Sequence, residues 1–399
     1  MAKTWITTAA ALLLSMAAMP LAAQSLKADE VLSSLALRPI SIPNPVAGSD
    51  GRTHLAYELV ASNASKLFLT LDRVELVDPA GSVVSSLSGP ALAAMATLYS
   101  GADTTIAPGG TAIIFLDAAF AGAAPASVTA RVTLTRQIAG ADGKPAPFPK
   151  IEPVPATITF SGATAVPGKP AVVIAPPLRG ANWVAVNGCC DAKTSHRGAV
   201  MAVNGTLRVP ERFAIDWVQL DARHRLYTGK IDQLASYAYF GAPVHAVADG
   251  TVVNLYTSAV EQVPGADAKG VTTENIGGNM LVIDIGGGNF AFFAHLQPGS
   301  LRVKLGDKVN TGDVIALLGN TGNTDAPHLH FHVMDGPSPL DANGLPYVFT
   351  RFTGQGVMDG ASADAVFDKG ASAVIDAKAL AGPQAGRLPL NNQIVDFGE

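Results

Sequence analysis

Short runs rich in Val, Ile, Leu, Thr and Phe, with partial alternation of apolar and polar residues, recur along the chain and predict β-strands rather than helices. The clearest four, HLAYELVAS, LFLTLDRVELVD, TAIIFLDAAF and SVTARVTLT, are separated by turns rich in Gly, Pro, Asp and Ser. Such spacing predicts a β-sandwich domain over residues 24–165, of the immunoglobulin-like type although the Cys and Trp pattern of antibody domains is missing. Helical periodicity is weak and gives two short candidates, near 29–37 and 90–98.

The β pattern resumes after a segment rich in Pro, Ala and Gly, residues 166–180, which predicts an extended linker. A hairpin is expected at 279–296, where NMLVIDI and FAFFAHL flank the turn GGGN. A second β-rich domain therefore covers 181–350. The remaining residues, 351–399, form an extension rich in Ala, Gly and Asp that ends in IVDF, a candidate closing strand.

Residues 1–23 have the layout of a secretory signal peptide. Lys3 precedes an apolar run that ends before Pro20, and the small residues Ala22 and Ala23 follow as a cleavage point. A membrane anchor is the alternative, but the run is short for the ~20 residues that cross a bilayer. We expect an exported product, periplasmic or secreted, with no stable membrane insertion after cleavage.

The amino-acid composition excludes several kinds of binding site. The 399 residues carry a net charge of −5 and no run of Lys or Arg, which argues against a nucleic-acid partner. Two cysteines exclude a disulfide scaffold and a four-cysteine zinc site. They are adjacent, Cys189 and Cys190, and in an oxidising compartment they could pair locally, pair between chains or stay free. Five of the eight histidines lie between His245 and His332.

The sequence HLHFH predicts a metal site. In a strand, His328, His330 and His332 project from one face, while Leu329 and Phe331 pack on the other. Neutral imidazoles grouped on one face are suitable metal ligands. A solvated, histidine-rich strand is the alternative.

Two residues elsewhere have the right chemistry to join this site. His295 ends the apolar run AFFAHL just before a turn, and Asp216 is an acidic residue within the apolar run RFAIDW. Asp216 could instead cap a turn. His224, in the charged turn DARHR, and His245, at the start of a strand, are expected to be structural.

The stretch from His196 to Phe349 resembles the lysostaphin-like, or beta-lytic (LytM-type), zinc metallopeptidases. The matching segments are RFAIDW, GAPVHAVADGTVV, GGNMLVIDIGGGNFAFFAHL and GNTGNTDAPHLHFHV. Many members of this family cleave peptide cross-links in bacterial cell walls, and their fold is a compact antiparallel β-sheet with a groove. The resemblance implies a mainly β protein whose C-terminal part is a lysostaphin-like antiparallel β peptidase domain.

The resemblance also implies roles for single residues. Asp216 and His330 match metal ligands of the family, and His295 and His328 match its catalytic histidines. His332 is expected to lie one pleat beyond the ligands and to hydrogen-bond rather than bind metal.

The third ligand is where the sequence departs from the common pattern. Many members have a His four residues before the Asp, but that position here is Arg212, whose guanidinium has no free lone pair for zinc. In the beta-lytic branch the first His lies further upstream, and His196 matches that arrangement. The alternative is a degenerate, metal-free site, as in relatives that regulate cell-wall amidases.

Together these matches imply an exported zinc metalloendopeptidase with one Zn²⁺ per chain, acting on stem or cross-link peptides of peptidoglycan. In such an enzyme the metal activates a water molecule, and His295 and His328 transfer protons. The alternative is a catalytically inactive, metal-free regulator or cell-wall binding protein. A third option is that the N-terminal domain docks a regulatory partner.

Overall fold

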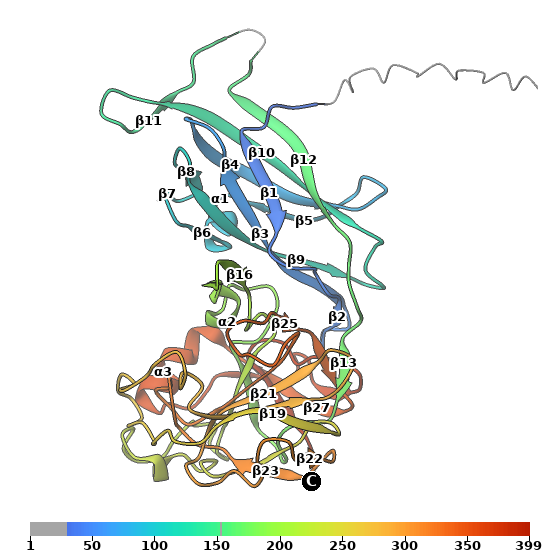
Figure 1. Ribbon diagram of the computed structural model, residues 1–399, viewed down its shortest axis with the longest axis vertical. Helices are drawn as coiled ribbons and strands as arrows, with labels where there is room; N and C mark the ends of the chain where they lie inside the picture. Colours follow the sequence, from blue (N-terminus) through green and yellow to red (C-terminus); the bar gives the residue numbers. More distant parts are fainter. Residues whose placement is uncertain (1–29, 152–153) are drawn as a thin grey trace, which may run out of the picture. The chain divides into compact units, whose positions relative to one another are not determined.

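Strands dominate the computed structural model, as the alternating pattern predicts (Figure 1). The structure describes residues 30–151 and 154–399, so the predicted signal peptide, residues 1–23, lies outside the described residues. By their contacts, the described residues from Ser33 to Glu399 form a single unit. Within the described residues, no helix is long and apolar enough to cross a membrane.

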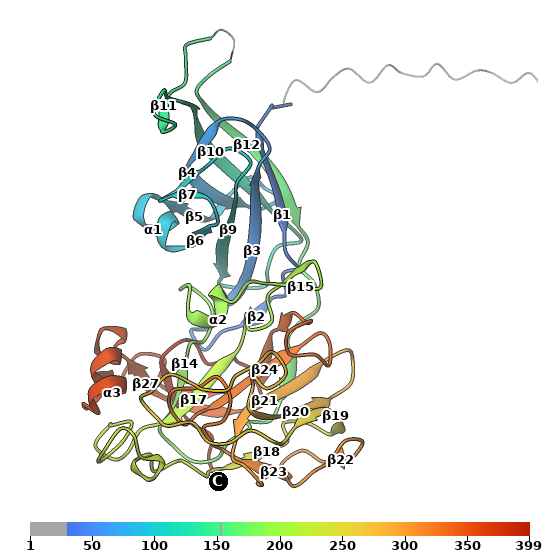
Figure 2. The same cartoon turned by 60° about the vertical axis from the view of Figure 1, so that its left-hand side comes forward.

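Two antiparallel sheets form the N-terminal region, drawn in blue to green in Figures 1 and 2. The first has the order β1 (Leu35–Pro39), β3 (Thr53–Asn63), β9 (Thr111–Phe120) and β6 (Ala96–Leu98), with β2 (Val46–Ala47) paired to β3. The second has the order β11 (Pro145–Pro147), β10 (Val128–Ala139), β4 (Phe68–Val77), β8 (Thr105–Ile106) and β7 (Gly101–Ala102). In addition, β12 (Thr157–Ala165) pairs with β10, and β5 (Val83–Ser88) pairs with β4. The four strands expected from the sequence are β3, β4, β9 and β10.

These two sheets share one apolar core. Along β10 every second residue from Val128 to Arg136 is buried, which is the period that places alternate side chains on one face. The apolar ones among them pack in one cluster with Leu55 and Leu59 of β3 and Leu71 of β4. Burying a side chain of this size stabilises the fold by ~1.5–3 kcal/mol. Two sheets around one core is the arrangement that a sandwich requires, while the immunoglobulin-like type stays a prediction.

One of the two helix candidates is wrong. The first part of the candidate near 90–98 corresponds to α1 (Gly89–Ala94), with β6 at its end, but residues 35–37 of the candidate near 29–37 belong to strand β1. This strand pairs antiparallel with β3 over its whole length, from Leu35 opposite Asn63 onwards. The available edge of β3 decides the conformation, because tertiary pairing overrides a weak local helical preference.

His54 of β3 lies in a buried cluster of opposite charges. Its Nδ1 is 2.9 Å from Oδ2 of Asp117, and its Nε2 is 3.2 Å from Oδ2 of Asp50. Burial lowers the pKa of His54, but the hydrogen bond and charge of Asp117, together with Asp50, outweigh burial and raise this pKa above 6.5. The protonated cluster therefore stabilises the fold at low pH, and the stabilisation is lost as the pH rises through the raised pKa.

We expect this loss to be measurable with the substitution His54→Gln. The free energy of unfolding of the wild type should exceed that of the variant by more at about pH 6 than at about pH 9. Urea unfolding at both pH values gives the two differences. A difference that stays constant or grows with pH would contradict the assignment.

A twelve-stranded antiparallel sheet dominates the C-terminal region. Its order is β22 (Lys308–Val309), β19 (Gly250–Tyr256), β20 (Asn279–Asp284), β21 (Phe290–Leu296), β24 (Leu329–Met334), β17 (Ile215–Gln219), β14 (Trp183–Val186), β30 (Gln393–Asp396), β27 (Phe352–Met358) and β28 (Ile375–Asp376). Two short strands, β25 (Gly344–Leu345) and β29 (Gly382–Gln384), pair with β24 and β27. The hairpin expected at 279–296 is β20 and β21.

The smaller elements surround this sheet. Three two-stranded pairs are β13 (Val172–Ile174) with β26 (Tyr347–Phe349), β15 (Met201–Val203) with β16 (Thr206–Arg208), and β18 (Pro243–His245) with β23 (Val314–Leu317). The helical turns are α2 (Ser195–Gly198), η1 (Leu234–Ser236), η2 (Gly360–Ser362) and α3 (Ala363–Lys369). Residues 351–399, predicted as an extension, supply β27 to β30 to the large sheet, and β30 is the strand expected at IVDF.

The neighbouring strands β21, β24 and β17 position the candidate site. On one face of β24, Leu329 and Phe331 are fully buried, as predicted, and pack in the main core. Phe331 contacts Phe293 of β21 and Tyr347 of β26 at ring-centroid distances of 5.1 and 5.2 Å. This apolar face anchors the strand, so that the histidines of the other face are held in fixed positions.

Candidate metal and catalytic site

Strand register brings Asp216 beside His330. In the antiparallel pair β17–β24, Asp216 is directly opposite His330, and on the other side of β24, Ala294 of β21 is opposite the same histidine. The Nδ1 of His330 lies 2.9 Å from Oδ1 of Asp216. Two residues 114 positions apart in sequence thus meet because of the pairing of two central strands.

Asp216 is the centre of the cluster. Its Oδ2 lies 3.1 Å from Nε2 of His196 and accepts a hydrogen bond of 2.9 Å from Nδ2 of Asn187, while its Oδ1 lies 3.3 Å from Nε2 of His328. Burial raises the pKa of the Asp216 carboxyl, but the charges and hydrogen bonds of His196 and His328 outweigh it and hold this pKa well below its usual value. The carboxylate is therefore ionised and surrounded by nitrogen donors.

His196 occupies the short helix α2, which Thr194 caps by accepting a hydrogen bond from the backbone N–H of Arg197. The side chain is 7% exposed, and its Nδ1 lies 3.0 Å from the backbone oxygen of Ala214. Burial lowers the pKa of His196, but the charge of Asp216 outweighs it and the net value rises to about 9. The structure thus brings the distant His196 to the carboxylate.

Arg212 has a different partner. Its Nε donates a 2.8 Å hydrogen bond to Oε2 of Glu58, and its Nη2 donates one of 2.7 Å to Oγ of Ser41. Both Arg212 and Glu58 are almost completely buried, and Arg197 approaches the other Glu58 oxygen at 3.6 Å. Arg212 is therefore one of two cations around a buried carboxylate, which is a structural use of the position where many relatives have a ligand.

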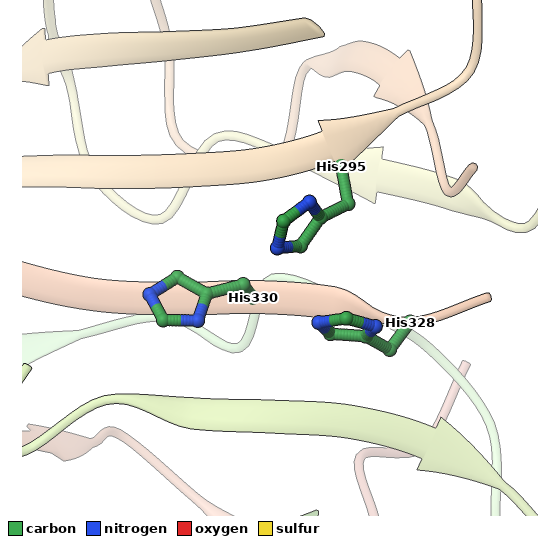
Figure 3. Close-up of side chains that lie close together, drawn as sticks. All are labelled: His295, His328 and His330. Carbon is green, nitrogen blue, oxygen red and sulfur yellow. The ribbon is translucent and has the colours of Figure 1, made fainter. Parts of the chain in front are cut away.

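His295 and His328 lie against each other beside this cluster. In Figure 3 the ring of His295 points from the end of its strand towards His328 and His330 on the neighbouring chain segment. The ring centroids of His295 and His328 are 4.5 Å apart. The Nδ1 of His295 lies 2.7 Å from the oxygen of Thr321, and that of His328 lies 2.8 Å from the oxygen of Ala326. In both rings Nδ1 therefore carries the proton, and Nε2 of His328 faces Oδ1 of Asp216.

The environments of these two rings differ. Burial and the charges of His328 and His330 hold the pKa of His295 well below its usual value. Burial also lowers the pKa of His328, but the charge and hydrogen bond of Asp216 outweigh it and raise the net pKa. His295 also has a backbone φ of 60°, in the region that non-glycine residues rarely adopt. Strained residues of this kind cluster at functional sites.

The histidines and Asp216 line a cleft with a volume of about 520 Å³. Its wall combines apolar side chains with acidic and amide groups, and none of its lining residues is Lys or Arg. Examples are Met201, Phe292, Leu340, Glu211 and Asn187. The volume of this cleft is in the range of pockets that bind ligands.

Two sets of donor atoms in this cleft are close enough to hold a metal ion. The nitrogen and oxygen donors of His196, Asp216 and His330 lie within 4.8 Å of one another, as do those of His295, His328 and His330. The first set has two imidazoles and one carboxylate, a combination that binds Zn²⁺ with an open fourth position. The donor set therefore fits zinc.

All five site residues predicted from the sequence meet in this cleft. His224 and His245 do not line it, and Nδ1 of His245 instead lies 2.9 Å from the backbone oxygen of Gly312. The sequence analysis missed Asn187, which contacts Asp216, and Thr324, whose Oγ1 lies 3.3 Å from Nδ1 of His328. Thr324 lies in GNTGNTDAP, a segment that resembles the peptidase family, and this resemblance is what could have indicated its place near the site.

Cys189 and Cys190 form a disulfide with each other, which is one of the three alternatives left open by the sequence. Both are buried, and the bond follows Asn187 by two residues. Arg197 donates a hydrogen bond from Nη1 to the backbone oxygen of Cys190. The disulfide therefore belongs to the loop that carries both Asn187 and His196.

A comparison with protein families identifies the family that residues 234–342 resemble. The model described as Peptidase family M23 matches residues 234–342. The chain contains an M23 peptidase domain. The matched segment includes His295, His328 and His330 but begins after His196 and Asp216. The M23 match thus covers the HLHFH strand and not the part of the cluster where the sequence departs from the common pattern.

Curated relatives of this chain share only part of its length. The glycyl-glycine endopeptidase ALE-1 of Staphylococcus capitis is 29% identical over 29% of the chain and 28% of its own length. The peptidoglycan DD-endopeptidase ShyB of Vibrio cholerae is 36% identical over 26% of the chain and 20% of its own length. The chain therefore matches less than a third of each of these relatives.

Among solved structures, the catalytic domain of lysostaphin from Staphylococcus simulans is 23% identical to this chain over the matched part. The match covers 36% of this chain and 80% of that one, with a TM-score of 0.22. A score this low does not establish a common arrangement of the whole chain.

Proposed function

We propose that this chain is an exported zinc metalloendopeptidase that hydrolyses peptide bonds in the stem or cross-link peptides of peptidoglycan. The observation that carries the proposal is that His196, Asp216 and His330 offer three donor atoms in the same cleft as the paired rings of His295 and His328. The M23 match and the names of the two endopeptidase relatives support peptide-bond hydrolysis in the cell wall.

In this proposal the two sets of residues have separate tasks. His196, Asp216 and His330 would hold one Zn²⁺, which supplies a Lewis acid that polarises the scissile carbonyl and lowers the pKa of water. His295 and His328 act as proton carriers, because each fixes its Nδ1–H on a backbone carbonyl, which leaves proton transfer to Nε2. One Nε2 would accept the proton of the attacking water and return it to the leaving amine, and the other ring, protonated at both nitrogens, would donate a hydrogen bond from Nε2 to the developing oxyanion.

Two observations support export of the protein from the cytoplasm. The first 23 residues have the layout of a signal peptide. The Cys189–Cys190 disulfide is typical of an oxidising compartment outside the cytoplasm. A peptidoglycan substrate is found in that compartment.

The alternative function, a metal-free regulator, depended on Arg212 at the usual ligand position. Because His196 brings a third donor to Asp216, Arg212 no longer argues against metal binding. Elemental analysis and zymography on purified peptidoglycan, with mass analysis of the released fragments, test the proposal directly. We expect one zinc per chain and fragments cut at a peptide bond. A zinc-free, inactive wild type would overturn it.

Substitutions of the proton carriers separate chemistry from metal binding. We expect His295→Ala and His328→Ala each to lower kcat by ~10²–10⁴-fold, the usual effect of losing a general acid or base. Both variants should retain one zinc, because three other residues form the proposed ligand set. The matched control is His224→Ala, outside the cleft, with unchanged activity. Loss of zinc in both variants would contradict the division of tasks.

A further inference from the structure

His332, the third histidine of HLHFH, is neither a proposed zinc ligand nor a proposed proton carrier, yet its side chain is buried beside them. The His332 side chain is almost completely buried, against the ring of Phe292 at a centroid distance of 5.0 Å. Its Nδ1 lies 2.9 Å from Nε2 of His330. Its own Nε2 is buried and has no hydrogen-bond partner among the described residues.

His330 is held differently from the other histidines of the cleft. The rings of His196, His295 and His328 each place Nδ1 within 3.0 Å of a backbone carbonyl oxygen, so Nδ1 keeps the proton and Nε2 is the atom left for a metal or for proton transfer. His330 instead turns Nδ1 towards Oδ1 of Asp216 and Nε2 towards His332. It is therefore the one histidine of these four whose Nδ1 would face a metal.

A ring nitrogen binds a metal only when it carries no proton. The carboxylate of Asp216, 2.9 Å away, attracts a proton to Nδ1 of His330, which would block that atom as a ligand. For Nδ1 to be free, the proton must lie on Nε2 and needs an acceptor there. The neighbouring Nδ1 of His332 provides that acceptor.

We propose that His332 is a positioning residue that accepts the Nε2–H of His330 and so holds His330 in the tautomer whose Nδ1 can bind zinc. This inference rests on the proposed zinc site. His332 would thus affect metal binding through its hydrogen bond with His330, without touching the metal. The buried, unpartnered Nε2 of His332 is consistent with such a role, because burying a polar atom without a partner costs stability that an apolar residue would not.

The proposal predicts effects of opposite sign on metal binding and on stability. His332→Leu removes the acceptor and also the unpartnered polar atom, whereas His332→Asn keeps an oxygen close to the position of Nδ1. We expect zinc affinity, measured by competition with a chromogenic chelator, to fall ~10–100-fold in His332→Leu. In His332→Asn it should stay within ~3-fold of the wild type. The Tm of metal-free His332→Leu should equal or exceed that of the metal-free wild type.

Two results would overturn the proposal. One is a zinc affinity of His332→Leu within the range of the wild type, and the other is an equal loss in His332→Asn and His332→Leu, which would indicate packing alone. If His332→Leu does not fold, long-range ¹H–¹⁵N spectra of the zinc-loaded wild type decide, and the proton of His330 should be on Nε2. A proton on Nδ1 there would refute the proposal.

The same measurements separate this inference from the proposed function. A protein that binds zinc with the expected dependence on residue 332 but does not cut peptidoglycan would refute the enzyme and leave the positioning role intact. A wild type that binds no zinc would refute both.

Discussion

Replacing His196 with alanine is expected to remove zinc from the protein and to abolish hydrolysis of peptidoglycan. The Nε2 of His196 lies 3.1 Å from the Asp216 carboxylate, and without it only Asp216 and His330 remain of the proposed ligand set. Loss of one of three protein ligands should weaken zinc binding by ~1,000-fold, about 4 kcal/mol. Elemental analysis after dialysis gives the occupancy, and chelator competition gives the affinity.

A matched control for this experiment is His245→Ala. His245 is half-buried. Its Nδ1 contacts a backbone carbonyl oxygen, as does Nδ1 of His196, but His245 lies outside the cleft. It should keep one zinc per chain and full activity. Full zinc occupancy in His196→Ala would show that the ligand assignment is wrong, whatever the activity of the wild type.

The substitution Glu58→Gln is expected to cause the largest loss of stability of any single change considered for this chain. Glu58 is fully buried between Arg197 and Arg212. The variant keeps the shape of the side chain but leaves two buried guanidinium groups without their counter-charge. Removing one partner of a buried ion pair costs about 3–5 kcal/mol. Urea unfolding of the metal-free protein measures the change in the free energy of unfolding.

A double-mutant cycle tests the cause of that loss. Glu58→Leu combined with Arg212→Leu removes both members of one ion pair, so it should cost less than the sum of the two single substitutions. Additive costs would indicate that the side chains contribute only by packing. Because Arg197 follows His196 directly, we also expect weaker zinc binding in Glu58→Gln than in the wild type.

Local periodicity made much of this protein predictable. The strand at Val128 alternates with period two, whereas the strands at His54 and Thr111 are short runs rich in apolar residues, and both patterns are set by a few neighbouring residues. The same holds for the HLHFH strand, where the separation of His330 from Phe331 into two faces needs no knowledge of the rest of the chain. Such features can be predicted from a short window of sequence.

Features that depend on distant partners could not be predicted in this way. The role of Arg212 depends on Glu58, 154 residues earlier, and nothing near Arg212 indicates that partner. The contact of Asn187 with Asp216 depends on the pairing of β14 with β17. Hydrogen-bond partners of ring nitrogens, which fix the tautomers, likewise become visible only when the strand register is known.

The position of β30 has a consequence for how the peptidase region can be divided. This strand, close to the C-terminus of the chain, pairs with β14, which in turn pairs with β17 and its Asp216. A fragment cut at residue 350 would leave the edge of β14 that faces β30 unpaired, while its other edge would still pair with β17. Exposed edges of this kind recruit strands from other molecules. Such a fragment would therefore tend to aggregate through an edge that is only one strand away from Asp216.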